Sequence, residues 1–214
     1  MRPAPQGLRA PRHLLWVEGK DDSAVVQSLC AQHEFPQVFR VKQKAGIGEI
    51  FRGLPVELRA TALERFGVVI DADDDARARW DAVRDTLLRV GYTDAPARLD
   101  PEGVVVGGAG KLPRFGAWIM PDNEAPGVLE TFAASLVPPD DVLWTNADAV
   151  LDEIPDEHRR FREVERPKAH IHTWLAWQEG PGSPMGQAIT KGDLDANAPA
   201  ARHFVAWLRR LFVD

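Results

Sequence analysis

Two short acidic stretches of the chain carry side chains that could perform chemistry. Glu18 follows the apolar run at residues 14–17 in LLWVEGKDD, and Asp71 and Asp73 follow the apolar run at residues 68–70 in VVIDADDD. Because ligands meet parallel α/β sheets at the carboxyl ends of the strands, the three carboxylates could gather at one edge. Carboxylates in a partly dry cleft repel one another, and a divalent cation relieves that repulsion. Oxygen ligands suit Mg²⁺ or Mn²⁺.

Each of these acids also has an ordinary structural interpretation. An acidic group before a helix often caps the helix and interacts with its positive end, which could be all that Asp74 and Asp75 do. Glu18 precedes a glycine and could be a simple loop residue. The joint occurrence of acids after two neighbouring strands, each followed by a helix, favours a common site over these separate roles.

Further side chains could extend such a site. A strand is expected to end at residue 120, so Asp122 and Glu130 could form an additional acidic site together with Asp75. The alternative is that Asp122 and Asn123 form a turn and that Glu130 is a solvated helix residue. The candidate phosphate contacts, two of them in the C-terminal part of the chain, are Lys20, Lys168 and His170.

The segments that must position these residues alternate between strand and helix. Apolar runs predict strands over residues 14–17, 38–41, 68–70, 104–106 and 117–120. Helical spacing predicts helices over 50–66, 128–136, 147–154 and 199–212, and another beginning near Pro167. Two more helices follow the acidic stretches: one is capped by Asp21 or Asp22, and one carries Trp80, Val83, Leu87 and Val90 on a single face. Gly67 is expected to separate helix from strand, and 46–48 and 180–186 are expected loops.

This alternation is typical of a doubly wound α/β protein with a Rossmann-type, mostly parallel sheet flanked by helices. We expect a flexible tail over residues 1–12, an α/β domain over 13–137, and a helical C-terminal extension over 138–214 that packs on the core.

Composition narrows the classes of function. The net charge of −6 over 214 residues argues against a broad basic surface for nucleic acid, although it allows a local basic groove. The single cysteine, Cys30, excludes an intrachain disulfide and a cysteine-cluster zinc site. No apolar run approaches the length of a membrane span, and the N-terminus has no signal-peptide core. A cytoplasmic protein without a membrane partner is expected.

The motifs VEGKDD and VVIDADDD together resemble those of the Toprim domain. This domain occurs in topoisomerases, primases, RNase M5-like maturases and overcoming-lysogenization-defect (OLD) nucleases. That family carries a glutamate after its first strand and an Asp-x-Asp after its third, and Glu18, Asp71 and Asp73 match these positions. The resemblance covers residues 13–125. The stretches WIMPDNEAPGVLE and KAHIHTWLAWQ resemble a small bacterial group of stand-alone Toprim-like proteins.

The resemblance implies a Toprim-like sheet with Mg²⁺ or Mn²⁺ held by Asp71 and Asp73, and with Glu18 as general acid/base or a further ligand. It implies cleavage of phosphodiesters in DNA or RNA. A topoisomerase would need a nucleophilic tyrosine on a separate domain, and Tyr92 is the only tyrosine; a primase would need a cysteine-rich zinc module. The stretch around Lys111 lacks the P-loop pattern that the ATPase of OLD nucleases requires. A small metal-dependent nuclease is the best remaining enzyme.

Two alternatives stay open beside the nuclease. One is a catalytically silent Toprim-like protein that regulates or binds a protein partner in a defence or repair system, and the other is a phosphoryl-transfer enzyme acting on a small nucleotide. A nucleic-acid partner has only one basic run to support it, and glutamates interleave with that run, which favours a solvated helix face. The basic residues of the run are Arg159, Arg160, Arg162, Arg166 and Lys168.

Overall fold

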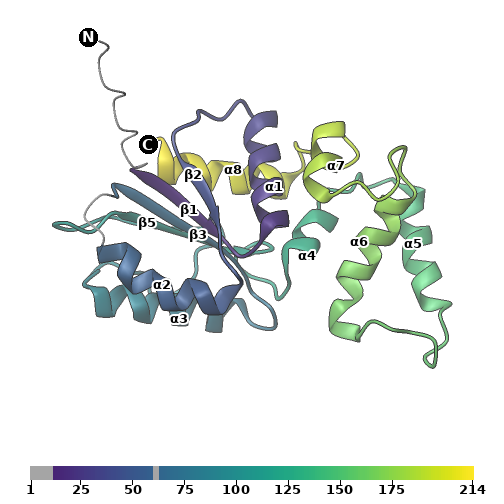
Figure 1. Cartoon of the computed structure of the whole chain (residues 1–214), viewed down its shortest axis with the longest axis horizontal. Helices are drawn as coiled ribbons and strands as arrows, with labels where there is room; N and C mark the ends of the chain where they lie inside the picture. The colour runs from purple at the N-terminus through teal and green to yellow at the C-terminus, as the bar shows by residue number, and fades with distance from the viewer. Residues whose placement is uncertain (1–11, 60–62) are drawn as a thin grey trace, which may run out of the picture.

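Five strands form one sheet in the computed structural model, which describes residues 12–59 and 63–214. The strands lie in the order β2-β1-β3-β5-β4 (Figure 1). Four of them run parallel, and β4 pairs antiparallel with β5. The strand bounds are His13–Val17 (β1), Arg40–Gln43 (β2), Arg65–Asp71 (β3), Val104–Val106 (β4) and Arg114–Met120 (β5). The prediction of an α/β protein with a mostly parallel sheet is confirmed.

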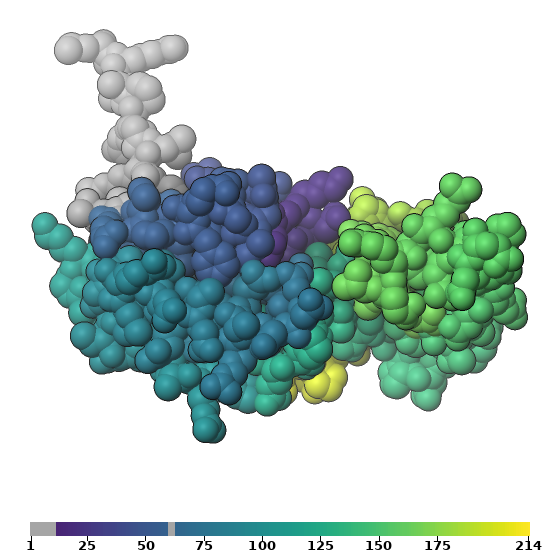
Figure 2. Space-filling model, turned by 90° about the horizontal axis from the view of Figure 1, so that it is seen from below, coloured from purple at the N-terminus to yellow at the C-terminus, as the bar shows by residue number. Residues whose placement is uncertain are grey.

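Helices cover both faces of the sheet. On one face lie α2 (Ile47–Arg59) and α3 (Ala76–Val90), and on the other lie α1 (Lys20–Gln32) and α8 (Pro199–Phe212) (Figure 1). The helix α7 (Met185–Lys191) packs on α1. The helix α4 (Leu129–Ala134) follows β5 and contacts α6 (Arg166–Ala176), which pairs with α5 (Val142–Asp152) and is preceded by the short 3₁₀ helix at Glu163–Glu165. Figure 2 shows α2 and α3 forming one surface, with the α5–α6 hairpin as a lobe beside it.

Apolar side chains on both faces of the central strands hold these layers together. Trp16 and Val68 face α2 and α3, whereas Leu15 and Val69 belong to the core under α1 and α8. Each is at most 1% exposed, and burying one such side chain contributes roughly 2 kcal/mol. Since both faces of the strands are buried, β1 and β3 read in the sequence as continuous apolar runs.

Two cross-strand glycines let α8 approach the sheet closely. Gly67 of β3 is opposite Gly116 of β5, and a Cβ on either would lie 2.7 or 2.6 Å from a methyl of Leu211. Gly67 therefore lies inside a strand, and the prediction that it separates helix from strand is wrong. The predicted helix over 50–66 is also too long: α2 ends at Arg59, and Arg65 and its neighbour already pair with β1. Residues 60–62 lie outside the described part of the chain.

The helix predicted after the second acidic stretch is α3. Asp75 is its N-cap and accepts a hydrogen bond from the Ala78 N–H, and Gly91 ends it in a left-handed conformation. Its apolar face contributes Trp80 to the core. In α1 the N-cap is Gly19 rather than Asp21 or Asp22.

The predicted loop over 180–186 is too long, because α7 begins at Met185. Residues 1–11 of the expected tail lie outside the described residues. No helix in the described ranges is long and apolar enough to cross a membrane.

Candidate active site

The two acidic motifs meet where β1 and β3 end. The strands are parallel neighbours with Val17 opposite Val69, so Glu18 and Asp71 emerge at the same edge of the sheet. The Asp71 N–H donates a hydrogen bond to Glu18 Oε1 at 2.9 Å. The structure thus brings together two side chains that lie more than fifty positions apart in the chain.

Asp71 is the most strongly perturbed acid of this edge. Its carboxylate Oδ1 accepts a hydrogen bond from the Leu129 N–H at 3.0 Å, at the start of α4. Burial, followed by the negative charges of Asp22 and Glu18, raises the pKa of Asp71 to about 8. Near neutral pH this carboxyl group therefore holds a proton that an ordinary aspartate would have lost.

A third acid at this edge, Asp22, was interpreted from the sequence only as a helix cap. It lies in the first turn of α1, is 7% exposed, and accepts a hydrogen bond from the Gly19 N–H at 3.1 Å through Oδ2. Its Oδ1 is buried without a hydrogen-bond partner among the described residues. Burial and the charges of Glu18 and Glu130 raise the pKa of Asp22 to about 6. Its position in the helix that follows Glu18 was the one sequence signal that could have identified it.

Asp73, the second aspartate of the Asp-x-Asp motif, lies on a loop in the left-handed backbone conformation, with φ of 53°. The loop is fixed by a pair of backbone hydrogen bonds with Gly127, just before α4. The exposed carboxylate of Asp73 forms an ion pair with Arg79 on α3. Arg79 also lowers the pKa of Glu18, although burial dominates and leaves that pKa above its ordinary value.

Glu130 and Lys168 connect this edge to the C-terminal helices. Glu130, on α4, is 9% exposed, and Lys168 Nζ on α6 lies 3.3 Å from its Oε1. The negative charge of Glu130 raises the pKa values of both Asp22 and Asp71. We call the acids that meet here the acidic cluster; its members are Glu18, Asp22, Asp71, Asp73 and Glu130.

The other candidate residues have contacts of their own. The side chain of Asp75 caps α3, and Asp122 Oδ1 accepts hydrogen bonds from two backbone N–H groups of its own turn, at 3.0 and 2.8 Å. His170 stacks on Trp144, with ring centroids 3.5 Å apart, and its Nε2 lies 2.9 Å from the carbonyl oxygen of the same residue. Lys20 is exposed at the start of α1. Of the three candidate phosphate contacts, Lys20, Lys168 and His170, it is Lys168 that forms an ion pair with a member of the acidic cluster, Glu130.

Some acids of the cluster already form ion pairs that would compete with a metal ion. Across residues 12–59 and 63–214, no group of three or more His, Cys, Asp or Glu side chains is arranged to hold an ion as it stands. Asp73 is turned to Arg79 and Glu130 to Lys168, so both acids would have to give up an ion pair. The chemistry of the donor atoms fits Mg²⁺ or Mn²⁺, because all of them are carboxylate oxygens. Their mutual repulsion favours a bound cation.

The basic run at residues 159–168 is largely neutralised by ion pairs within the molecule. Arg166 pairs with Asp148 and Asp152, and Arg162 pairs with Glu165. Arg159 lies 3.1 Å from Asp156 and 3.4 Å from Glu163. Only Arg166 and Lys168 lie on a helix, whereas Arg159, Arg160 and Arg162 lie in the segment between α5 and the 3₁₀ helix, so the prediction of a single helix face is wrong. The ion pairs indicate a charged surface.

Fold and site together define an α/β protein with five carboxylates at the carboxyl edge of a mostly parallel sheet. Residues 12–213 match the model of a family described as "Protein of unknown function (DUF3226)", and the chain belongs to that family. No match was found among curated proteins or among solved structures.

Proposed function

We propose that this chain is a Toprim-type phosphodiester hydrolase that depends on Mg²⁺ or Mn²⁺ and acts on nucleic acid. The observation that carries the proposal is the hydrogen bond between the Asp71 N–H and the Glu18 carboxylate, because it joins the two motifs that define the resemblance. The pKa values of Asp71 and Asp22 are raised first by burial and then by neighbouring negative charges, and they support the proposal because a shared cation would offset both effects.

The residues of the acidic cluster would divide the work. Asp71 and Asp73 would hold the ion, with Asp22 and Glu130 as further oxygen donors. A bound ion would stabilise negative charge on the phosphate and on the attacking or leaving oxygen. Burial raises the pKa of Glu18, so this side chain can hold a proton closer to neutral pH than an ordinary glutamate, as a general acid/base requires.

Digestion of labelled single- and double-stranded DNA and RNA tests this proposal. We expect cleavage with Mg²⁺ or Mn²⁺, none with EDTA, and a loss of at least about a hundredfold in Glu18→Gln, in the range by which general acid/base groups act. Asp71→Asn should lose activity because it removes an ion ligand. The control is Asp74→Asn, an equivalent substitution of an exposed acid in the same loop, which should retain activity.

Cleavage that persists in Glu18→Gln and Asp71→Asn would contradict the proposed site. Calorimetric titration with Mg²⁺ on the same proteins separates binding from turnover. Protein that binds Mg²⁺ but cleaves none of the four substrates would favour a catalytically silent Toprim-like protein with a regulatory or binding role. The ion pairs of Arg79 and Lys168 support that second candidate, because they already neutralise two acids of the cluster.

A third candidate, phosphoryl transfer on a small nucleotide, is supported by a hollow beside the site. It measures about 360 Å³ and is lined by residues 72–75 with Ala78, Arg79 and Ala82. That volume suits a small ligand rather than a duplex. Release of phosphate or pyrophosphate from nucleoside triphosphates, with no cleavage of polynucleotides, would support it over the nuclease.

A further inference from the structure

The strand β2 lies at one edge of the sheet, and its outer side is unpaired in the part of the chain that the structure describes. Within the described ranges it pairs with β1 alone. The Lys44 N–H donates to the Val17 carbonyl at 2.9 Å, so the backbone groups of residues 40, 42 and 44 point to β1 in the alternation of a parallel ladder. The N–H and C=O groups of Val41 and Gln43 therefore point away from the sheet. An edge of this kind can accept a further strand.

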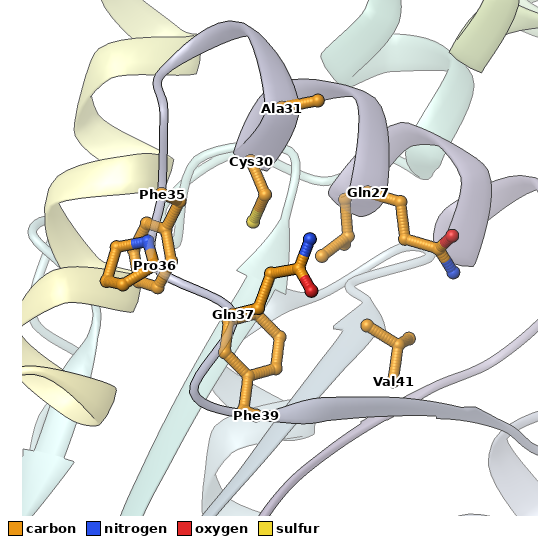
Figure 3. A pocket seen from close by; sticks show the side chains of 9 residues that line it. Gln27, Cys30, Ala31, Phe35, Pro36, Gln37, Phe39 and Val41 are labelled. Carbon is orange, nitrogen blue, oxygen red and sulfur yellow. The ribbon is translucent and has the colours of Figure 1, made fainter.

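A pocket of about 350 Å³ opens beside this edge, on the α1 face of the sheet. Figure 3 shows the side chains of Cys30, Phe39 and Val41 converging on it, with the amides of Gln27 and Gln37 also at its wall. The remaining lining residues are Val26, Ala31, Phe35 and Pro36. Burial raises the pKa of the Cys30 thiol to about 12, so the thiol stays protonated and is a poor nucleophile. Cys30 therefore serves as an apolar lining residue of the pocket.

The opposite face of the same edge is basic. Side chains alternate along a strand, so Arg40 and Lys42 lie on the face of Trp16, and Lys42 Nζ is 5.9 Å from the centre of the Trp16 ring. Both are exposed, and neither forms an ion pair with any residue that the structure describes. Antiparallel pairing of β2 with a second copy would set these cations against each other, which disfavours that occupant.

We propose that β2 and its pocket bind an extended peptide segment of a partner protein as a sixth strand, with one bulky apolar side chain flanked on both sides by acidic ones. The peptide backbone would bond to the N–H and C=O groups of Val41 and Gln43. Since neighbouring side chains of a strand point to opposite faces, a central leucine would enter the pocket while its two acidic neighbours meet Arg40 and Lys42. This interface is separate from the acidic cluster and does not depend on the proposed nuclease activity.

Fluorescence anisotropy with the full chain and three fluorescein-labelled heptapeptides tests this interface. The peptides have capped termini and differ only in their three central residues, which glycine and threonine residues flank. Their central residues are Asp-Leu-Asp, Asp-Ser-Asp and Lys-Leu-Lys. We expect Asp-Leu-Asp to bind about tenfold tighter than either other peptide, because each lacks one of the two contacts. Amide shifts in NMR spectra should concentrate at β2 and in the segment between α1 and β2.

Two variants test the two halves of the interface. Cys30→Trp fills the pocket, and the double variant Arg40→Glu/Lys42→Glu reverses the charge of the edge; each should weaken Asp-Leu-Asp binding about tenfold. The matched controls are Val56→Trp, at a 72% exposed position of α2, and Arg77→Glu on α3. Both controls should bind as the parent does. The charge reversal alters exposed side chains only, so it keeps the test decisive if the tryptophan disturbs folding.

Equal binding of the three peptides, or no binding at about millimolar concentration, would overturn the proposal. So would binding that neither variant weakens. Sedimentation that shows a dimer broken by Cys30→Trp and kept by Val56→Trp would assign the edge to a second copy instead. Single-stranded DNA could also compete for this edge. If it displaces the peptide, binds more tightly than the peptide and loses affinity in Arg40→Glu/Lys42→Glu, the edge would be assigned to nucleic acid.

Discussion

The pH dependence of stability provides a direct test of the acidic cluster. An acid whose pKa is raised by folding adds stability at low pH, and that stability is lost as the pH rises through its folded-state pKa. The pKa of Asp71 rises from 3.8 to about 8, so the metal-free protein should lose stability as the pH rises between these values. The slope approaches 1.4 kcal/mol per pH unit, which gives a loss of about 2 kcal/mol between roughly pH 6 and pH 7.5.

Asp71→Asn isolates this contribution. The amide keeps an oxygen that can accept the Leu129 N–H, but it cannot ionise, so most of the loss above about pH 6 should disappear. The pKa of Asp22 rises only to about 6, so that group acts chiefly below the chosen window. Glu18, whose pKa is also raised, acts in the same direction in both proteins.

Urea unfolding of both proteins at the two pH values, in EDTA, measures the effect. Asp74→Asn, in the same loop, should keep the parent's pH dependence. Mg²⁺ at about a hundredfold excess over its Kd should restore about 2.7 kcal/mol to the parent and little to Asp71→Asn. A parent that is equally stable or more stable at the higher pH, or parallel losses in parent and Asp71→Asn, would refute the raised pKa of Asp71.

Three further substitutions test the fold and the site. Gly67→Ala would place a methyl group 2.7 Å from a leucine methyl of α8 and should lower the free energy of unfolding by about 1–3 kcal/mol in urea denaturation. Tyr92→Phe removes the hydroxyl that donates to the Pro113 carbonyl at 2.7 Å and should cost about 1–2 kcal/mol in the same assay. Arg79→Met removes the ion pair that competes for an acid of the cluster, so calorimetry should show Mg²⁺ binding about two- to fivefold tighter. Arg77→Met, on the exposed face of the same helix, should leave that affinity unchanged.

The sequence allowed the prediction of those parts of the fold that have a strong local pattern. Continuous apolar runs marked β1 and β3 because both faces of these strands are buried, and a regular three- and four-residue spacing marked α3. The boundary between α2 and β3 was misplaced because Phe66 also fits a helical spacing, and only its pairing with Leu14 of β1 and Phe115 of β5 makes it a strand residue. Gly67 shows the same limit, since its role depends on α8, far away in the chain.

The candidate site was predictable to a similar extent. The position of Glu18 and Asp71 follows from one general rule, that neighbouring parallel strands end at the same edge, and the rule needs no side-chain detail. Asp22 was not predicted as a site residue, because a carboxylate in the first turn of a helix has a sufficient role as a cap. The cations Arg79 and Lys168 reach the cluster from α3 and α6, and no local pattern indicates such tertiary contacts.

The acidic cluster is costly for a protein that has nothing to bind there. Ionisation of Asp22 or Asp71 lowers the stability of the folded protein, because folding raises the pKa of both groups. In addition, a carboxylate oxygen of Asp22 is buried without a hydrogen-bond partner among the described residues. An asparagine at position 71 could accept the same backbone hydrogen bond without the cost of a buried and repelled charge, so stability alone does not explain the aspartate. Binding a cation would reverse the penalty, and through Glu130 it would compete with Lys168 for the same carboxylate. Metal binding at the sheet edge and the contact of the α5–α6 hairpin with that edge should therefore be coupled.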